Sequence, residues 1–326
     1  MKVLGIGNAL IDLLHRLSSD DLLHELNLPK GSMQLIDRDR YMQISQRLKG
    51  THCDIACGGS AANTICGAAK LGMDVGYVGK VGKDAFGQLF RDELESDDIT
   101  PHLFIKESTP SGCATTLISQ DGERTFGTYL GAAATMNVED IEKESFVGYD
   151  WVYVEGYLIT VPELIEYIMA KAKREGCRVA IDMASYNVVQ DNLELFRRLI
   201  DTYVDMVFAN EEEAFALTGK KPEKALRELA ELCSIAVVKI GKEGSLIGAD
   251  GEYIHVPTAE TKPIDTTGAG DLYAAGFLYG MDNGCSYERC AQIGSIVAGN
   301  VIEVIGTKMK HERWITITEQ IDALNC

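Results

Sequence analysis

The amino-acid sequence predicts an α/β protein of three layers, in which helices cover both faces of a mainly parallel central sheet and a small β-sheet forms a lid. The first observation is that apolar runs of strand length alternate with amphipathic stretches of helix length along most of the chain. Because this repeated alternation requires crossover connections, the strands should lie parallel between two helical layers. The second observation is a pair of β-rich runs, residues 112–119 and 124–130, that stand outside the alternation.

The elements of the central layers follow one another along the chain. The expected strands are Val3–Ile6, Val75–Val81, Trp151–Glu155, Arg178–Asp182, Met206–Ala209 and Ile235–Ile240. The expected helices between them are Ala61–Leu71, Asp84–Ser96, Glu163–Arg174, Leu193–Asp201, Glu211–Leu217 and Pro222–Leu232. After Asp265 the pattern becomes helical, and the expected helices are Ala269–Met281, Ser286–Val304 and Thr318–Leu324.

The lid is predicted from its turn chemistry. Gly112–Ser119 and Arg124–Leu130 are joined by Gln-Asp-Gly-Glu, a sequence typical of a hairpin turn, and Ser32–Ile36 can supply a further strand. We therefore expect residues 1–326 to form one domain, with a discontinuous lid built from about residues 10–37 and 110–131.

The composition is that of an ordinary globular protein, with 46% hydrophobic and 25% charged residues. Its 326 residues carry 31 Lys and Arg against 49 Asp and Glu, a formal net charge of −18. This charge disfavours nucleic acid and anionic membranes as partners, although a local basic pocket can still hold a small anion. The N-terminal apolar run is interrupted by Asp12 and lacks a cleavage signal, so we expect a cytoplasmic protein.

Cysteine and histidine give no sign of a metal site. The nine cysteines lie among apolar neighbours, and an odd number in a long chain fits free buried thiols better than a disulfide framework. Cys53 and Cys57 come closest to a metal pair, but no second pair follows at zinc-site spacing. The six histidines form no triad or metal spacing, and we expect them to be structural.

The segment DTTGAGD, from Asp265 to Asp271, leads directly into the apolar stretch LYAAGFLYG. Small residues at the start of a helix leave backbone N–H groups free, and together with the positive end of the helix dipole these groups form an anion site. A carboxylate inside such a site, at Asp271, is suited to accept the proton of an attacking hydroxyl while the amides hold a phosphoryl group. The alternative is that Asp271 only caps the helix.

A second Gly-rich turn, CGGSAANT from Cys57 to Thr64, also opens a predicted helix. Its paired glycines let the backbone approach a ligand closely, and Ser60 and Asn63 can form hydrogen bonds with a polyhydroxy compound. Equally, Ser60 can serve only as the N-cap of the helix.

The segment from Gly5 to Leu10 begins like a dinucleotide-binding fingerprint, but Leu10 stands where the third glycine is needed. What remains is a strand end followed by Asn8 and Asp12 in apolar surroundings. The Asp12 carboxylate can accept two hydrogen bonds and so hold vicinal sugar hydroxyls. The alternative is an aspartate that caps a turn.

Two further segments follow predicted strands. Asn210 and Glu213 share one face of a helix's first turn, where they can organise water around a divalent ion or, alternatively, only complement the helix dipole. The segment from Lys239 to Gly244 contains two glycines suited to a chain that passes close to a nucleotide, although a simple turn explains them equally well. Neither a P-loop nor the motif set of protein kinases occurs.

In this order, the motifs resemble those of the ribokinase-like (PfkB) family of carbohydrate and nucleoside kinases. GGSAANTICGAAKLGMDVGYVGKVGKDAFG at Gly58–Gly87 is similar to the family's N-terminal signature, and DTTGAGDLYAAGFLYG at Asp265–Gly280 to its C-terminal one. Within the family, the opening GIGNALIDLLHRLSSDDLLHELNLPKGSMQLID and the segments GERTFGTYLGAA, EGYLITVP and ANEEEAFAL look most like the adenosine kinase branch. The resemblance, which covers nearly the whole chain, implies a ribokinase-like fold and transfer of the γ-phosphate of MgATP to the primary hydroxyl of a nucleoside, with adenosine as the first candidate.

The resemblance also implies roles for individual residues. Asp271 would be the catalytic base, and Arg124 in the lid would bring a planar cation over the phosphates. The amides that stabilise the transferred phosphoryl group would be those of Gly268, Ala269 and Gly270.

Binding roles follow in the same way. Asp12 would hold two ribose hydroxyls of the acceptor, and the supporting residues would be Asn8, Gly59, Ser60 and Asn63. Asn210 and Glu213 would position phosphate and Mg²⁺, with Glu213 acting through water. The rest of the ATP site would include Lys239, Gly241 and Gly244. Many members also use K⁺, which would lie near Asp265 and Thr267.

Two other functions stay open at this point. One is a sugar kinase that acts on ribose, fructose or a related sugar through the same residues. The other is a sensor that binds a nucleoside or sugar without turnover, against which the proton acceptor and magnesium element argue. The sequence leaves open whether the chain is a monomer or a homodimer. It also leaves open whether the following residues contact a nucleobase or belong to the core: Leu10, Met33, Leu35, Leu130 and Met136.

Overall fold

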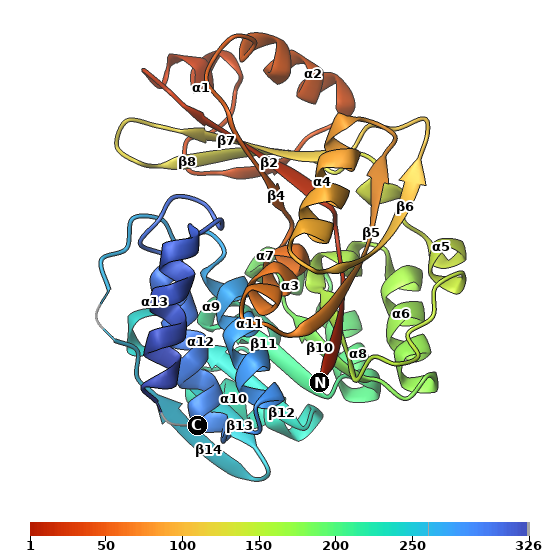
Figure 1. Cartoon of the computed structure of the whole chain (residues 1–326), viewed down its shortest axis with the longest axis vertical. Coiled ribbons are helices and arrows are strands. Elements are labelled where there is room, and N and C mark those ends of the chain that lie inside the picture. Colours follow the sequence, from red (N-terminus) through yellow and green to blue (C-terminus); the bar gives the residue numbers. More distant parts are fainter. Residues whose placement is uncertain (260, 325–326) are drawn as a thin grey trace.

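The computed structural model, which describes residues 1–259 and 261–324, contains two sheets and the helices that cover them (Figure 1). In this part of the chain the large sheet has nine strands, and in spatial order they are β14 (Glu252–Val256), β13 (Ser245–Ala249), β12 (Ile235–Lys239), β11 (Met206–Asn210), β10 (Arg178–Asp182), β9 (Trp151–Glu155), β1 (Lys2–Ile6), β5 (Asp74–Gly82) and β6 (Thr100–Lys106). All neighbours from β12 to β6 are parallel, whereas β13 pairs antiparallel with both β12 and β14. The predicted mainly parallel sheet is therefore confirmed.

Helices cover both faces of this sheet, as the alternation predicted. One layer contains α3 (Ser60–Lys70), α4 (Ala85–Ser96), α11 (Ala269–Asp282), α12 (Tyr287–Val301) and α13 (His311–Asp322). The other contains α5 (Val138–Glu142), α6 (Pro162–Arg174), α7 (Tyr186–Asp191), α8 (Leu193–Tyr203), α9 (Glu211–Thr218) and α10 (Pro222–Leu232). Successive residues of β1 show the division, because Val3 packs into the core under α3 and α11 while Leu4 packs into the core under α6 and α8. No described helix combines the length and the hydropathy that crossing a bilayer requires.

The small sheet lies beyond the carboxyl end of β1, where the chain runs directly into β2. Within the described residues it has five strands, and in spatial order they are β3 (Met33–Leu35), β8 (Arg124–Tyr129), β7 (Gly112–Ile118), β2 (Leu10–Arg16) and β4 (Asp54–Gly58). Its outer face is covered by α1 (Asp21–Glu25) and α2 (Arg38–Arg47) (Figure 1). Leu23, Leu26, Ile44 and Leu117 form a small core beneath them. Strand β4 belongs to this sheet although it lies outside the ranges expected for the lid.

Several elements differ from the sequence-based expectation. The edge strand β6 and the hairpin β13–β14 were not predicted, and α13 begins at His311 rather than at Thr318. The residue before α13, Lys310, makes no side-chain capping hydrogen bond, so the sequence offers no start signal there. Three short 3₁₀ helices, at Ala133–Thr135, Gly156–Thr160 and Gly241–Glu243, complete the described elements.

Candidate active site

The carboxyl ends of four neighbouring parallel strands carry polar side chains. Glu155, Asp182, Asn210 and Lys239 are the last residues of β9, β10, β11 and β12. Their register partners include Asp182 with Glu155 and Asn210 with Lys239, so the four side chains form a row along one edge of the sheet. Ligands of open α/β sheets bind outside this edge, because the loops that follow the strands leave a crevice there.

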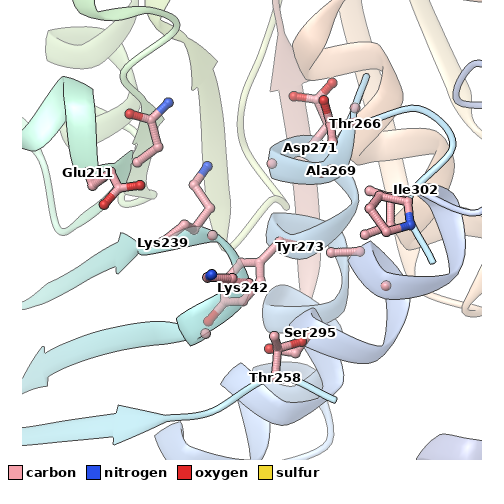
Figure 2. A pocket seen from close by; sticks show the side chains of 18 of the residues that line it. Glu211, Lys239, Lys242, Thr258, Thr266, Ala269, Asp271, Tyr273, Ser295 and Ile302 are labelled. Atoms are coloured by element: carbon pink, nitrogen blue, oxygen red, sulfur yellow. The ribbon is translucent and has the colours of Figure 1, made fainter. Parts of the chain in front are cut away.

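A cavity of about 970 Å³ extends from this row to helix α12. Figure 2 shows Lys239 and Asp271 facing the cavity from β12 and α11, while Thr258 and Ser295 lie at its opposite end. The sequence-predicted residues that line it are Ser60, Asn210, Glu213, Lys239, Gly241, Gly244, Gly268, Ala269, Gly270 and Asp271. The small residues Ala298 and Gly299 on α12 leave room for a flat group at the far end. The volume and the lining of the cavity therefore suit a nucleotide, with polar groups at one end for phosphates and a slot between small residues at the other end for a flat ring.

The polar end of the cavity is an anion site at the start of α11. Within the described chain, no group accepts a hydrogen bond from the backbone amides of Gly268, Gly270 and Asp271. Gly268 has a φ of +73°, and a Cβ there would meet the Thr307 side chain at 2.4 Å, so glycine is required to open the loop in this way. Three free amides at the positive end of a helix dipole are suited to bind a phosphoryl group.

Asp271 lies inside this anion site. Ser60 donates a hydrogen bond to its Oδ1 at 2.7 Å, and the Asn63 amide donates one to Oδ2 at 3.0 Å. Burial raises the pKa of Asp271 to about 6, and the negative charge of Asp182 adds to the rise. The carboxylate is therefore oriented by two donors and has a pKa close to that of an efficient general base at neutral pH. The structure places Ser60 and Asn63 on this carboxylate, in addition to any contact they make with an acceptor.

Lys239 supplies a cation beside the anion site. Its Nζ lies 3.2 Å from Oδ2 of Asp182 and would be 2.9 Å from a Cβ on residue 270, so glycine at 270 lets the ammonium approach the helix start. Burial lowers the pKa of Lys239, but the charges of Asp182 and Glu213 outweigh burial and raise it. Lys239 is therefore a permanent, buried positive charge at the polar end of the cavity.

Asn210 and Glu213 form a reciprocal capping box at the start of α9. The Asn210 side chain accepts from the Glu213 amide at 2.8 Å, while both Glu213 carboxylate oxygens accept hydrogen bonds from Asn210. The helix-start alternative raised by the sequence is thus present in the structure, and it fixes the Glu213 carboxyl group at the cavity wall. Burial and the charge of Asp182 raise the pKa of Glu213.

The residues around the polar end fit Mg²⁺. The buried carboxyl groups of Asp182, Glu213 and Asp271 face one ammonium group, Lys239, so a phosphate chain brought among them needs a further cation. No three His, Cys, Asp or Glu side chains of the described residues lie close enough to hold a metal ion by themselves. Phosphate oxygens and water would therefore complete the coordination, which is how Mg²⁺ is usually bound at nucleotide sites.

Asp12 faces this region from the small sheet. No described residue donates a hydrogen bond to its carboxylate, which lies against Gly58 so closely that a Cβ there would be 2.3 Å from Oδ2. Burial raises the pKa of Asp12 to about 7, the nearby Lys308 opposes the rise, and Asp271 adds to it. Two carboxylate oxygens that no described residue contacts as a donor can accept hydrogen bonds from a polyhydroxy acceptor.

Asn8 and Gly59 lie at the entrance of α3 rather than in the cavity. The Asn8 amide donates to Oε1 of Glu155 at 2.6 Å, and Oε2 of Glu155 accepts the Ala61 amide at 3.2 Å. A Cβ on Gly59, whose φ is +100°, would be 2.2 Å from the Asn8 carbonyl oxygen. Burial raises the pKa of Glu155 to about 7, and the hydrogen bond from Asn8 opposes the rise. Asn8 therefore holds the Gly-rich turn through Glu155 in this structure, and its expected role in acceptor binding stays a prediction.

Arg124, Asp265 and Thr267 meet where β8 approaches the loop before α11. The guanidinium pairs with Asp265 at 2.5 Å and donates to the Thr267 hydroxyl at 3.1 Å. These three residues are not among those that line the cavity. In this structure Arg124 contacts the loop that carries the anion site, and its expected place over the phosphates stays a prediction.

Among the residues of this site that sequence reasoning missed are two acids, Glu155 and Asp182. Each is the last residue of a strand that was predicted correctly, and each is a buried acid at the end of an apolar run. An acidic residue at the carboxyl end of a buried parallel strand is a signal that the sequence carried, because a buried carboxylate needs a partner and ligands bind at this edge of the sheet.

Comparisons with known proteins agree with this geometry. A family model described as pfkB family carbohydrate kinase matches residues 30–313. The crystal structure of adenosine kinase from Sinorhizobium meliloti is 34% identical, with a TM-score of 0.88 over 98% of this chain and 99% of that one. A probable sugar kinase from Rhizobium etli is 32% identical, with a TM-score of 0.88 over 98% of both chains. Ribokinase from Arabidopsis thaliana is 29% identical over 76% of this chain and 68% of its own.

Proposed function

Since the chain belongs to the pfkB family of carbohydrate kinases, and is therefore a kinase that phosphorylates an alcohol group, we propose that its acceptor is a nucleoside, adenosine first of all. The γ-phosphate of MgATP is transferred to the primary hydroxyl, and Asp271 takes the hydroxyl proton. A similar protein named adenosine kinase and another named probable sugar kinase share nearly the same fold, so the choice of acceptor rests on the site itself.

The observation that carries the choice is the apolar surface around Asp12. Residues in register on neighbouring strands point to the same face, and Asp12 is in register with Ala114, Thr128 and Leu35 across β7, β8 and β3. The next row on that face contains Leu14, Thr116, Phe126 and Met33. Met33 is 50% exposed and Leu35 is 65% exposed. A free sugar offers little to cover these side chains, whereas a nucleobase attached to a ribose held by Asp12 would cover them.

The five residues whose role the sequence left open differ in their exposure on this surface. Met33 and Leu35 are exposed on the face that carries Asp12, and Leu10 and Leu130 are half-buried, whereas Met136 is fully within the core. We propose Met33 and Leu35 as contacts of the base.

The mechanism follows from the arrangement of charges. Asp12 orients the sugar, Ser60 and Asn63 orient the Asp271 carboxylate, and the amides at the start of α11 and Lys239 compensate charge on the transferred phosphoryl group. Asn210 and Glu213 would hold hydrated Mg²⁺ beside the phosphates, where the ion would supply further charge neutralisation. We also propose the cytoplasm as the location, because the thiols of Cys57, Cys66, Cys113 and Cys177 are buried without disulfides.

The experiment that tests the proposed acceptor is ADP formation from MgATP with a panel of adenosine, inosine, guanosine, cytidine, ribose, fructose and 2-dehydro-3-deoxygluconate. We expect the highest kcat/KM with adenosine. Turnover with a free sugar alone would reject the nucleoside and leave the sugar kinase. Binding of adenosine in a thermal-shift assay without any turnover would favour the sensor.

The apolar surface gives a second prediction. The double change Met33→Ser and Leu35→Ser should raise the KM for adenosine about tenfold or more, because the base loses two apolar contacts, while kcat changes little. The matched control is Ile105→Ser, which alters another side chain that is 47% exposed, on the edge strand β6. An unchanged KM in the double variant would mean that the base, if one is bound, lies elsewhere.

A further inference from the structure

The Asp265 carboxylate is the point at which the small sheet, the anion site and the loop after α12 meet. Its Oδ1 accepts the Thr267 amide at 3.1 Å and the Thr267 hydroxyl at 2.8 Å. Its Oδ2 accepts the Gly306 amide at 2.6 Å and pairs with Arg124 at 2.5 Å. These four donors use the positions at which a carboxylate accepts hydrogen bonds.

Arg124 is buried in this arrangement. Its side chain is 11% exposed and that of Asp265 is 4% exposed, and the guanidinium also donates to the Thr267 hydroxyl. The fork of the guanidinium thus spans the two residues, Asp265 and Thr267, that the family resemblance associates with K⁺. A monovalent metal ion at the Asp265 carboxylate would have to displace the guanidinium, so this donor set does not fit K⁺.

The same contacts connect the small sheet to the catalytic carboxylate. Asp265 holds the amide of Gly306, and the next residue, Thr307, donates a hydrogen bond to Oδ1 of Asn63 at 3.1 Å. Asn63 in turn donates to Asp271. Arg124 is the first residue of β8, so the position of the small sheet bears directly on the loop that orients the base.

We propose that Arg124 is the built-in cation of the loop from residue 265 to 270, and that it takes the place of a monovalent metal ion at Asp265. It acts as a positioning residue: it neutralises Asp265, keeps the free amides of the anion site in place, and does so only while the small sheet lies where this structure has it. Among the described residues, Asp12 is a further carboxylate and Arg16 a further cation close to Arg124, so Asp265 is its ion-pair partner and Asp12 a more distant one.

The first test uses the unaltered protein and rests on the proposed kinase function. Phosphorylation of the best acceptor is measured at constant ionic strength in the chloride salts of K⁺, Na⁺ and tetramethylammonium. We expect kcat/KM to agree within about twofold among the three salts. Activation by K⁺ of tenfold or more would overturn the proposal, whereas absence of turnover with every acceptor would instead reject the proposed function.

The second test uses Arg124→Met, Arg124→Lys and, as a surface control, Arg47→Met, whose exposed guanidinium pairs with Glu25. Arg124→Met should lose at least tenfold in kcat and recover part of it with guanidinium or K⁺, and K⁺ should raise its melting temperature but not that of the unaltered protein. Arg47→Met should respond to neither. Full activity of Arg124→Met in tetramethylammonium, or a loss that no cation relieves, would overturn the proposal. The melting temperatures in K⁺ test it even if no acceptor is found, because they do not depend on turnover.

Discussion

Replacing Asp271 by Asn should lower kcat by roughly 10²–10⁴-fold and leave acceptor binding nearly unchanged. The side chain keeps its size and its position beside Ser60 and Asn63, but it can no longer take the proton of the attacking hydroxyl. The variant should fold, because the change removes a buried charge. Steady-state kinetics with MgATP, together with a thermal-shift titration of the acceptor, separate the loss of chemistry from a loss of binding.

The pH profile is an independent test of the same residue. The pKa of Asp271 is raised to about 6, and only the deprotonated carboxylate accepts a proton. Activity of the unaltered protein should therefore be constant above neutral pH and fall tenfold for each pH unit well below 6. Turnover of Asp271→Asn close to that of the unaltered protein, or retention of the acid limb in that variant, would contradict the assignment of Asp271 as the base.

The large sheet could be predicted because its strands are buried on both faces and read as apolar runs separated by amphipathic helices. Strand β2 of the small sheet lacks the pattern that would identify it as a strand with one exposed face. Leu10 and Leu14 on one face and Leu13 on the other are all apolar, so the period of two that marks a half-buried strand is absent. The apolar residues on the exposed face fit the acceptor surface that we propose around Asp12, and such a surface follows from the site and not from the strand pattern.

The candidate site could be predicted only as separate motifs. Glycines and polar residues in the two signatures indicated an anion site and an acceptor site, but the hydrogen bond from Ser60 to Asp271 joins residues 211 positions apart. No spacing rule reaches that far. Glu155 and Asp182 escaped prediction for a different reason. Each ends a strand that the apolar pattern predicts, and the pattern does not show that the terminal acid is buried and needs a hydrogen-bond or ionic partner.

Replacing Lys239 should cause the second large loss of activity. Changing it to Met removes the buried cation beside the free amides of α11, and we expect kcat/KM for MgATP to fall by about 10²–10³-fold, the usual cost of losing one preorganised group that stabilises transition-state charge. Lys224→Met, which removes an exposed lysine of α10, is the matched control and should leave the kinetics unchanged.

The change also leaves Asp182 buried without its cation, which by itself destabilises the fold. The double variant with Lys239→Met and Asp182→Asn separates the two effects, because it removes both charges. If Lys239 served only to neutralise Asp182, the double variant would recover activity as well as stability. We expect it to recover stability alone, since the phosphoryl group still lacks the ammonium.

The acid limb of the Lys239→Met profile adds a readout that a purely structural role would not move. The Lys239 charge lowers the pKa of Asp271, so its loss should raise that pKa and shift the acid limb to higher pH. Without the lysine, Asp271 has only the negative charges of Asp182 and Glu213 beside it and stays protonated up to a higher pH. Part of the activity lost at neutral pH should therefore return as the pH is raised. An acid limb at unchanged pH would show that the charge of Lys239 does not act on the Asp271 carboxylate, which would contradict the proposed interaction between them.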